Sequence, residues 1–192
     1  MEEGDQETLA LWSEFRDLSI VKYKQIYERI NVAFDIYSGE SQYSLEQMRK
    51  VMKELEDLEL LDRENGARII NFKTLTPAII EKSDGSMLYL SRDIAAAIDR
   101  HEVFSFDRMF YIVGNQQDYH FKQLFKILEM MGKPWAGNCT HLNFGLIKSK
   151  NGNMSTRNGS VVFLEDILNT TKEEMHGAMK VQQSPYNRFI LF

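Results

Sequence analysis

Polar side chains follow three of the apolar segments that the sequence predicts to be strands. The three groups are Tyr89 with Asp93, the run Asn115, Gln116, Gln117 and Asp118, and the basic loop NGNMSTRNG at residues 151–159. In open parallel sheets, ligands bind outside the carboxyl ends of the strands, where loops and helix starts meet. If the three strands are parallel neighbours, the three groups face one crevice.

The first two groups carry side chains suited to a charged ligand. Asp93 is predicted in the first turn of a helix, where the helix dipole favours an ionised carboxylate, the natural bidentate partner of a guanidinium. Gln117, near another helix start, has a donor and an acceptor for an ammonium or carboxylate group. Each residue also has an ordinary use: Asp93 begins a helix, Tyr89 packs at a strand edge, Gln117 is solvated, and His120 packs or lies on the surface.

The third group is a positively charged loop. It offers three cationic side chains and two hydroxyl groups, from Lys148, Lys150, Arg157, Ser155 and Thr156. Such a loop can clamp a polyphosphate and stabilise the charge that develops on it during transfer, although a solvated basic loop is the commoner use of this composition. The window from residue 130 to 164 contains no Asp or Glu, so it is locally positive in an acidic chain. The chain has no Walker-type phosphate loop and no recognisable serine–histidine nucleophile arrangement.

Composition and charge limit the function classes. With 192 residues, 43% hydrophobic residues and a net charge of −5, the chain is typical of one globular domain, or one domain with a lobe, and not of a general polyanion binder. Cys139 is its only cysteine, which excludes an intrachain disulfide and favours a reducing compartment. The four histidines lack metal-ligand spacing, so no metal site is expected. No apolar run is long enough to cross a membrane, and the N-terminus has neither a secretory signal nor a transit pattern.

Hydrophobic periodicity predicts helices that alternate with strands. Helices are predicted over 5–30, after Ser44, after Leu90, after Asn115 and over 165–180; strands are predicted over 32–37, over 77–90 as a hairpin, and over 109–113, 141–147 and 160–164. Ser44 and Gln47 have the spacing of a capping box, and Asp84 with Gly85 suits the hairpin turn. Residues 62–67 are interpreted as a polar connection.

The predicted helices also have apolar stripes that face a core. The helix after Ser44 places Met48, Val51, Met52 and Leu55 inward, and the helix after Asn115 places Phe121, Leu124, Phe125 and Leu128 inward. Strands that alternate with such helices favour crossover units. The sequence therefore predicts an α/β fold with a mostly parallel sheet and helices on both faces.

Several ordered motifs resemble one enzyme family. They are LWSEFRDLSI, YSGES, KSDGSMLYLSRDIAAAIDR, QQDYHF, VVFLEDILN and, after HLNFG, the sequence MSTR at residues 154–157. MSTR resembles the second signature of class I aminoacyl-tRNA synthetases, and residues 10–180 resemble arginyl-tRNA synthetase. The resemblance implies the C-terminal part of a Rossmann-like nucleotide-binding fold: a helix and an inserted α+β lobe over 1–84, the second half of the catalytic fold over 85–180, and a divergent tail over 181–192.

The same resemblance implies a reaction and its residues. ATP and L-arginine give arginyl-adenylate and pyrophosphate, and the arginyl group then moves to tRNA(Arg); Mg²⁺ is expected with ATP, and no tightly bound cofactor. Arginine binding falls to Tyr89, Asp93 and Gln117. Catalysis over the ATP phosphates falls to Met154, Ser155, Thr156, Arg157 and Lys150, since Asn158 replaces the family's basic residue and Lys148 or Lys150 supplies the charge. The rest of the ATP site is assigned to His120, His141, Asn143, Phe144 and Gly145.

The family's HIGH-type motif and its anticodon-binding domain are absent from this sequence. We therefore expect a catalytic-domain fragment, a monomer without membrane attachment, that activates arginine poorly or not at all by itself. The sequences HLNFGLI and FLEDILN resemble those of the mitochondrial or fungal form of the family. This resemblance favours the mitochondrial matrix, with the cytoplasm as the alternative. Two rival functions are a truncated, non-catalytic binding module and an ATP-dependent ligase outside tRNA chemistry.

Overall fold

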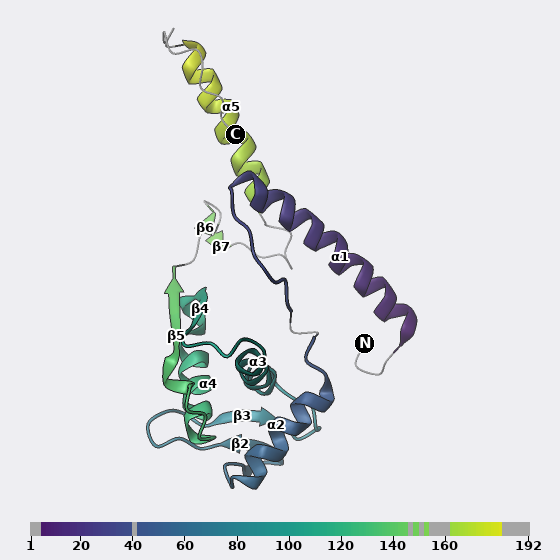
Figure 1. The fold of residues 1–192 in the computed structure, drawn as a ribbon, viewed down its shortest axis with the longest axis vertical. Helices are drawn as coiled ribbons and strands as arrows, with labels where there is room; N and C mark the ends of the chain where they lie inside the picture. Colours follow the sequence, from purple (N-terminus) through teal and green to yellow (C-terminus); the bar gives the residue numbers. More distant parts are fainter. Residues whose placement is uncertain (1–4, 40–41, 146–147, 150–151, 154–161, 182–192) are drawn as a thin grey trace. The chain divides into compact units, whose positions relative to one another are not determined.

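The computed structural model describes residues 5–39, 42–145, 148–149, 152–153 and 162–181. The chain forms two compact units: residues 1–37 with 147–192, and residues 38–146. Figure 1 shows the helices and strands in chain order. The predicted domain boundary between residues 84 and 85 falls inside the second unit. The division into domains stays a prediction.

The long N-terminal helix of the first unit is confirmed. Helix α1 spans Gln6–Arg29, and the side chain of Asp5 caps it by accepting a hydrogen bond from the backbone N–H of Thr8. None of its residues is buried. Further along the chain, α5 spans Leu164–Val181, in agreement with the predicted final helix, and Lys22 of α1 forms an ion pair of 2.7 Å with Glu165 of α5.

The strand predicted over residues 32–37 is wrong. The structure gives these residues no strand pairing; instead, the Phe34 ring contacts the rings of Tyr27 and Tyr37, with centroids 5.0 and 6.0 Å apart. Period-two apolar spacing makes a strand only when a partner strand accepts its hydrogen bonds. The extended segment predicted over 160–164 is also not found in its described part, because Leu164 already begins α5.

Two short strands complete the described first unit. Strand β6, Lys148–Ser149, pairs antiparallel with β7, Gly152–Asn153. This backbone pair lies between the predicted strand at 141–147 and the MSTR motif, as part of the basic loop that the sequence singled out.

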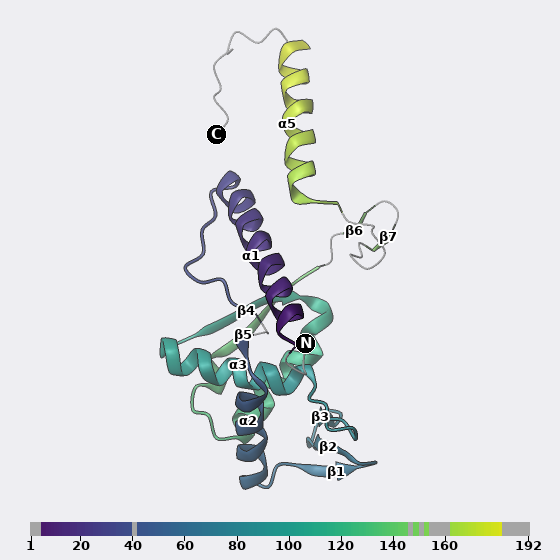
Figure 2. The ribbon, with the colours of Figure 1, turned by 90° about the vertical axis from the view of Figure 1, so that its right-hand side faces the viewer.

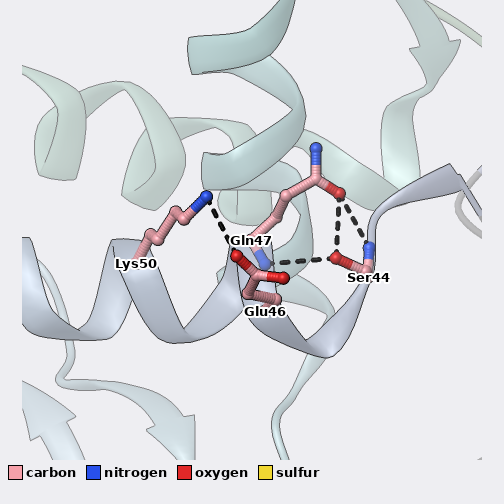
Figure 3. A network of polar contacts seen from close by, with 4 residues as sticks. All are labelled: Ser44, Glu46, Gln47 and Lys50. Atoms are coloured by element: carbon pink, nitrogen blue, oxygen red, sulfur yellow. Dashed lines mark hydrogen bonds and ion pairs between the residues drawn. The ribbon is translucent and has the colours of Figure 1, made fainter.

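The second unit begins with the capping box that the sequence predicts (Figure 3). The backbone N–H of Ser44 donates to Oε1 of Gln47 at 2.8 Å, and the backbone N–H of Gln47 donates to Oγ of Ser44 at 3.3 Å. These bonds satisfy donors that a helix start leaves free. Helix α2, Leu45–Asp57, follows, and its predicted inward stripe is buried.

A three-stranded antiparallel sheet follows α2. Its strands are β1, Asp62–Glu64, β2, Ala67–Ile70, and β3, Ala78–Glu81, in that spatial order. Residues 62–67, predicted as a polar connection, form the β1–β2 hairpin instead. Its turn is Asn65-Gly66, with φ values of 50° and 84°, and this dipeptide is a strong signal for a two-residue hairpin turn.

The predicted hairpin over 77–90 is only partly correct. Strand β3 and the Asp84-Gly85 turn are present, but the returning segment makes a single bridge, from Met87 to Glu81. Helix α3 then spans Tyr89–Phe104, with Leu88 as its N-cap. The sequence predicts Ser91 as the N-cap, so the helix begins three residues before its predicted start, and Tyr89 lies in a helix rather than a strand.

A parallel pair of strands carries the rest of the second unit. Strand β4, Met109–Gly114, pairs in parallel with β5, Cys139–Phe144, as an α/β fold requires. The connection between them contains the 3₁₀ turn η2, Asn115–Gln117, the helix α4, Asp118–Met130, and a second 3₁₀ turn, η3, Ala136–Asn138. Figures 1 and 2 show α2 and the antiparallel sheet at one end of the unit, β4 and β5 toward the other, and α3 between them.

The core of the second unit joins all its layers. Buried side chains from α2, β2, β3, α3 and α4 form one cluster, in which Leu55, Ile80, Ile94 and Leu128 are fully buried. The predicted α/β class is confirmed, with helices packed on a parallel sheet. The parallel part of the sheet is the β4–β5 pair. Phe110 and Ile112 are exposed on the face of this pair that the helices do not cover. Within the described residues of this unit, the helices therefore cover one face of the pair. No described helix is both long and apolar enough to span a membrane.

Candidate functional site

The candidate site lies at the carboxyl ends of β4 and β5. The two strands end together, because Gly114 and Phe144 are register partners. Helix α4 starts directly after β4 and η2, and α3 packs against α4. The first halves of two helices and the ends of two parallel strands thus meet at one edge, which is the place where α/β sheets bind ligands.

Asp93 of α3 and His120 of α4 contact each other at this edge. The Nε2 atom of His120 lies 2.6 Å from Oδ2 of Asp93, and the side chains are 23% and 38% exposed, respectively. Asp93 is the fifth residue of α3, so the prediction that it lies in the first helical turn is wrong, and the helix dipole is not what favours its charge.

Tyr89 and Asp93 project from the same face of α3. They are four residues apart, which is about one helical turn. Tyr89 is 67% exposed, whereas Leu90, Ser91 and Ile94 are buried on the opposite side, where Oγ of Ser91 donates to the backbone oxygen of Leu88 at 2.6 Å. Burial of Ser91 fixes the rotation of the helix, and this rotation turns the Tyr89–Asp93 face outward.

Gln117 lies at the start of α4, as its N-cap residue, and is exposed. It precedes His120 by three residues, so both belong to the first turn of the helix that faces Asp93. The structure therefore brings Asp93 and His120 together and leaves Gln117 and Tyr89 with exposed side chains at the same two helix starts.

A second aspartate holds the end of β5. Oδ1 of Asp118, the first residue of α4, lies 3.1 Å from Nδ1 of His141 and accepts a hydrogen bond of 2.7 Å from Nδ2 of Asn143. The side chain of His141 is only 8% exposed, and its Nε2 lies 3.0 Å from the backbone oxygen of Val113. Its ring packs on Phe121 with a centroid distance of 4.4 Å.

These contacts decide what His141 and its neighbours offer to a ligand. Both ring nitrogens of His141 are engaged inside the protein. Asn143, Phe144 and Gly145 are exposed at the strand end, and a Cβ atom built on Gly145 would meet no atom within 4 Å. Of the residues assigned to the ATP site, Asn143, Phe144 and Gly145 are therefore accessible to a ligand.

Sequence reasoning noted Asp118 among the polar residues after β4 but gave it no role. A signal was available, because an acidic residue in the first turn of a helix after a parallel strand is well placed to reach the neighbouring strand end. Its partners, 23 and 25 residues later in the sequence, were not deducible from local pattern.

The loop residues predicted to act on phosphates, Lys150 and Met154 to Arg157, lie outside the described residues. Among the cationic side chains between residues 130 and 164, Lys133 forms an ion pair within the second unit: its Nζ lies 2.7 Å from Oε1 of Glu54. Within the part of the chain that the structure describes, no three His, Cys, Asp or Glu side chains are grouped as metal ligands would be.

The chemistry of the edge follows from these geometries. Asp93 presents a carboxylate that one imidazole holds and that solvent still reaches, so a planar cation can approach it. The end of β5 presents a polar amide, an aromatic ring and a glycine beside open space. The arrangement suits a ligand with a guanidinium or ammonium group next to a second, flatter group.

Comparison with known proteins gives concordant matches. The family model described as "tRNA synthetases class I (R), catalytic domain" matches residues 1–186. The chain is 48% identical over 190 residues to the probable cytoplasmic arginine–tRNA ligase of Schizosaccharomyces pombe, and 50% identical over 189 residues to that of Dictyostelium discoideum. Each alignment covers 97% of this chain.

The fold is similar to that of a solved structure. The crystal structure of arginyl-tRNA synthetase from Plasmodium falciparum superposes with a TM-score of 0.78 at 18% identity, covering 98% of this chain and 32% of that one. The chain spans 30% and 31% of the length of the two curated relatives.

Proposed function

Because the chain belongs to the arginyl-tRNA synthetase family and matches its class I catalytic domain, we propose that it contributes the arginine-binding edge and part of the ATP site to an arginine–tRNA ligase. In that reaction the carboxylate of L-arginine attacks the α-phosphorus of ATP and pyrophosphate leaves. A ribose hydroxyl of tRNA(Arg) then attacks the carbonyl of the arginyl-adenylate, and AMP leaves.

One observation carries the proposal: Asp93 offers an accessible carboxylate at the carboxyl edge of the β4–β5 sheet, 2.6 Å from His120. A guanidinium binds a carboxylate through two parallel N–H donors, a geometry that an ammonium group cannot reproduce. Tyr89, one turn earlier on the same helix face, would pack beside the guanidinium. Gln117, at the start of α4, would bind the polar groups of the amino acid.

ATP is proposed to bind at the end of β5. Asn143, Phe144 and Gly145 would line its adenine end, and the residues Met154 to Arg157 with Lys150 would act on the phosphates, as the resemblance implies. Mg²⁺ would arrive with ATP, because such ions are commonly held by substrate phosphates and waters with only one or two carboxylates.

The proposed compartment is the cytoplasm, the alternative in the sequence interpretation. The two relatives above are named as cytoplasmic enzymes, and they lend no support to a mitochondrial location. The mitochondrial or fungal form remains a prediction from sequence wording. The monomeric state is likewise a proposal.

A second candidate is a binding module without catalysis. Its supporting observation is the open face of the parallel sheet, where Phe110, Ile112, Leu142 and Phe144 are 50%, 70%, 45% and 52% exposed. Parallel sheets are usually covered on both faces. Arginine-dependent ATP–pyrophosphate exchange by this chain would exclude the second candidate, because a module without catalysis gives no exchange.

Asp93→Asn tests the arginine site directly. We expect the 192-residue chain to bind L-arginine and not L-lysine in an NMR titration, and the variant to lose about 100-fold in arginine affinity, because it loses a charge-assisted bidentate contact worth about 3 kcal/mol. Glu102→Gln is the matched control, since it removes an exposed carboxylate from the same helix. Equal binding of lysine, or equal effects of the two substitutions, would overturn the assignment.

A further inference from the structure

Asp118 is the only described residue whose carboxylate touches two side chains of β5. Oδ1 lies 3.1 Å from Nδ1 of His141 and 2.7 Å from Nδ2 of Asn143. Oδ1 accepts a hydrogen bond from Asn143 and has a further lone pair toward His141. The contacts link the first residue of α4 to the end of the neighbouring strand.

His141 completes a closed connection between three elements. Its Nε2 lies 3.0 Å from the backbone oxygen of Val113 on β4, and its Nδ1 lies 3.1 Å from Oδ1 of Asp118 on α4. His141 is the register partner of Tyr111 on β4, and its ring packs against Phe121. With both nitrogens engaged and 8% of its side chain exposed, His141 is placed to hold structure rather than to bind a ligand.

Asn143 is in a different position. It is exposed at the strand end, beside Phe144 and Gly145, and its carboxamide is held through Nδ2 by Asp118. This bond fixes the rotation of the amide, so that its oxygen points away from Asp118. The carboxamide is therefore oriented before any ligand arrives, which lowers the entropy cost of binding.

We propose that Asp118 is a positioning residue for the nucleotide end of the site: it orients Asn143 directly and fixes the carboxyl end of β5 through His141. This inference rests on the proposed function, because the proposed ATP site includes Asn143. Asp118 itself touches no substrate. Its effect is to set the direction of a neighbouring amide and the position of the strand that carries it.

The first experiment tests the contacts without ligand. In ring and side-chain amide NMR spectra of the ¹⁵N-labelled chain, we expect Asp118→Ala to shift the ring ¹⁵N signals of His141, because Nδ1 loses the carboxylate beside it. The side-chain amide signals of Asn143 should shift in the same variant. Unchanged spectra at both residues would overturn the proposal. Asp118→Asn keeps an oxygen acceptor and serves as the second variant if Asp118→Ala unfolds. In Asp118→Asn, too, the side-chain amide signals of Asn143 are expected to shift.

The second experiment tests the consequence for binding, with ATP and L-arginine as separate probes. We expect Asp118→Ala to weaken ATP binding about tenfold and arginine binding less than about twofold, since the lost contacts orient the β5 end and not Asp93. Glu129→Gln, an exposed carboxylate on α4, is the matched control and should change neither affinity. A general loosening of the fold would weaken both ligands alike and would overturn the positioning role.

The two proposals fail in different ways. If the parent chain binds arginine but not ATP, the role of Asp118 is overturned and the arginine site stands. If arginine does not bind while ATP does, and Asp118→Ala still weakens ATP, the positioning role stands and the arginine assignment falls. Binding of neither ligand overturns both.

Discussion

The Asp93–His120 and Asp118–His141 pairs lie at the same edge of the β4–β5 sheet and differ in which groups reach solvent. In the first pair both side chains are partly exposed, and the contact is a single one of 2.6 Å between two helices. In the second pair the histidine is 8% exposed, and the carboxylate also binds Asn143. One pair is open to a further partner, and the other is closed.

The difference shows that a contact between an aspartate and a histidine can serve two purposes. An exposed carboxylate held by one imidazole retains acceptor capacity for an incoming cation. Oδ1 of Asp118 already accepts a hydrogen bond from Asn143 and lies 3.1 Å from the ring of His141. Burial of the histidine and the number of side chains that the carboxylate contacts, rather than residue type, therefore separate the proposed ligand-binding pair from the proposed positioning pair.

The largest expected effect breaks the closed pair. Asp118→Ala should lower the free energy of unfolding by about 3 kcal/mol, because it removes the hydrogen bond of Asn143 to a charged group, worth up to about 3 kcal/mol, and leaves Nδ1 of His141 without its partner. Urea unfolding, followed by circular dichroism, measures the change in midpoint at constant slope.

Asp107→Ala is the control for that substitution. Asp107 is an exposed aspartate just before β4, at the opposite end of the strand from the site. Its removal should change the free energy of unfolding by no more than about 0.5 kcal/mol. If Asp118→Ala costs no more than this control, the closed pair contributes nothing to the fold and the contrast between the pairs disappears.

A smaller effect, near 2 kcal/mol, sharpens the contrast through pH. Tyr111 is the register partner of His141, and burial raises the pKa of its hydroxyl from 10.0 to about 12, opposed by the charge of Arg100, whose guanidinium lies over the ring. Above pH 10 the unfolded chain releases this proton and the folded chain keeps it, so stability falls from pH 10 to about 12. A pKa raised by about two units corresponds to about 2.8 kcal/mol in full at about 1.4 kcal/mol per unit, and about 2 kcal/mol of this is lost between pH 10 and pH 12.

Tyr111→Phe isolates this contribution, because it removes the hydroxyl and keeps the ring. The difference in unfolding free energy between the parent and the variant should change across the pH interval from 10 to 12 and stay constant below it. If the difference in unfolding free energy were the same at all pH values, water would reach the Tyr111 hydroxyl. The region beside His141 would then not be closed to solvent.

Local sequence pattern predicted those elements that local bonds define. The capping box at Ser44 and Gln47 and the buried stripe of α2 depend on residues within one or two helical turns, and both are confirmed. The start of α3 was misplaced because Ser91 has the residue type of an N-cap, whereas in the structure its hydroxyl is buried and bonds to Leu88. A preference for a capping position does not outweigh burial of the side chain.

The site was predicted only as a set of neighbouring groups. The rule for strand ends predicts one shared edge if the three strands are parallel neighbours. This premise is confirmed for β4 and β5, but it is wrong for the strand before Asp93, because β3 belongs to the separate antiparallel sheet. The contacts themselves, Asp93 with His120 and Asp118 with His141, join residues 27 and 23 positions apart in the sequence. They depend on how α3 crosses α4 and on the strand register, and neither is encoded in short-range spacing.

The smallest expected effect concerns the open pair. Asp93→Ala should lower the free energy of unfolding by less than about 1 kcal/mol, because both partners are partly exposed and water replaces each of them. A double-mutant cycle with His120→Ala measures the coupling, again by urea unfolding, and should also give less than about 1 kcal/mol. A coupling above about 2 kcal/mol would place this pair with structural ion pairs rather than with exposed ones. Asp93 would then be bound too tightly to His120 to accept a guanidinium, and the proposed arginine site would lose its carboxylate.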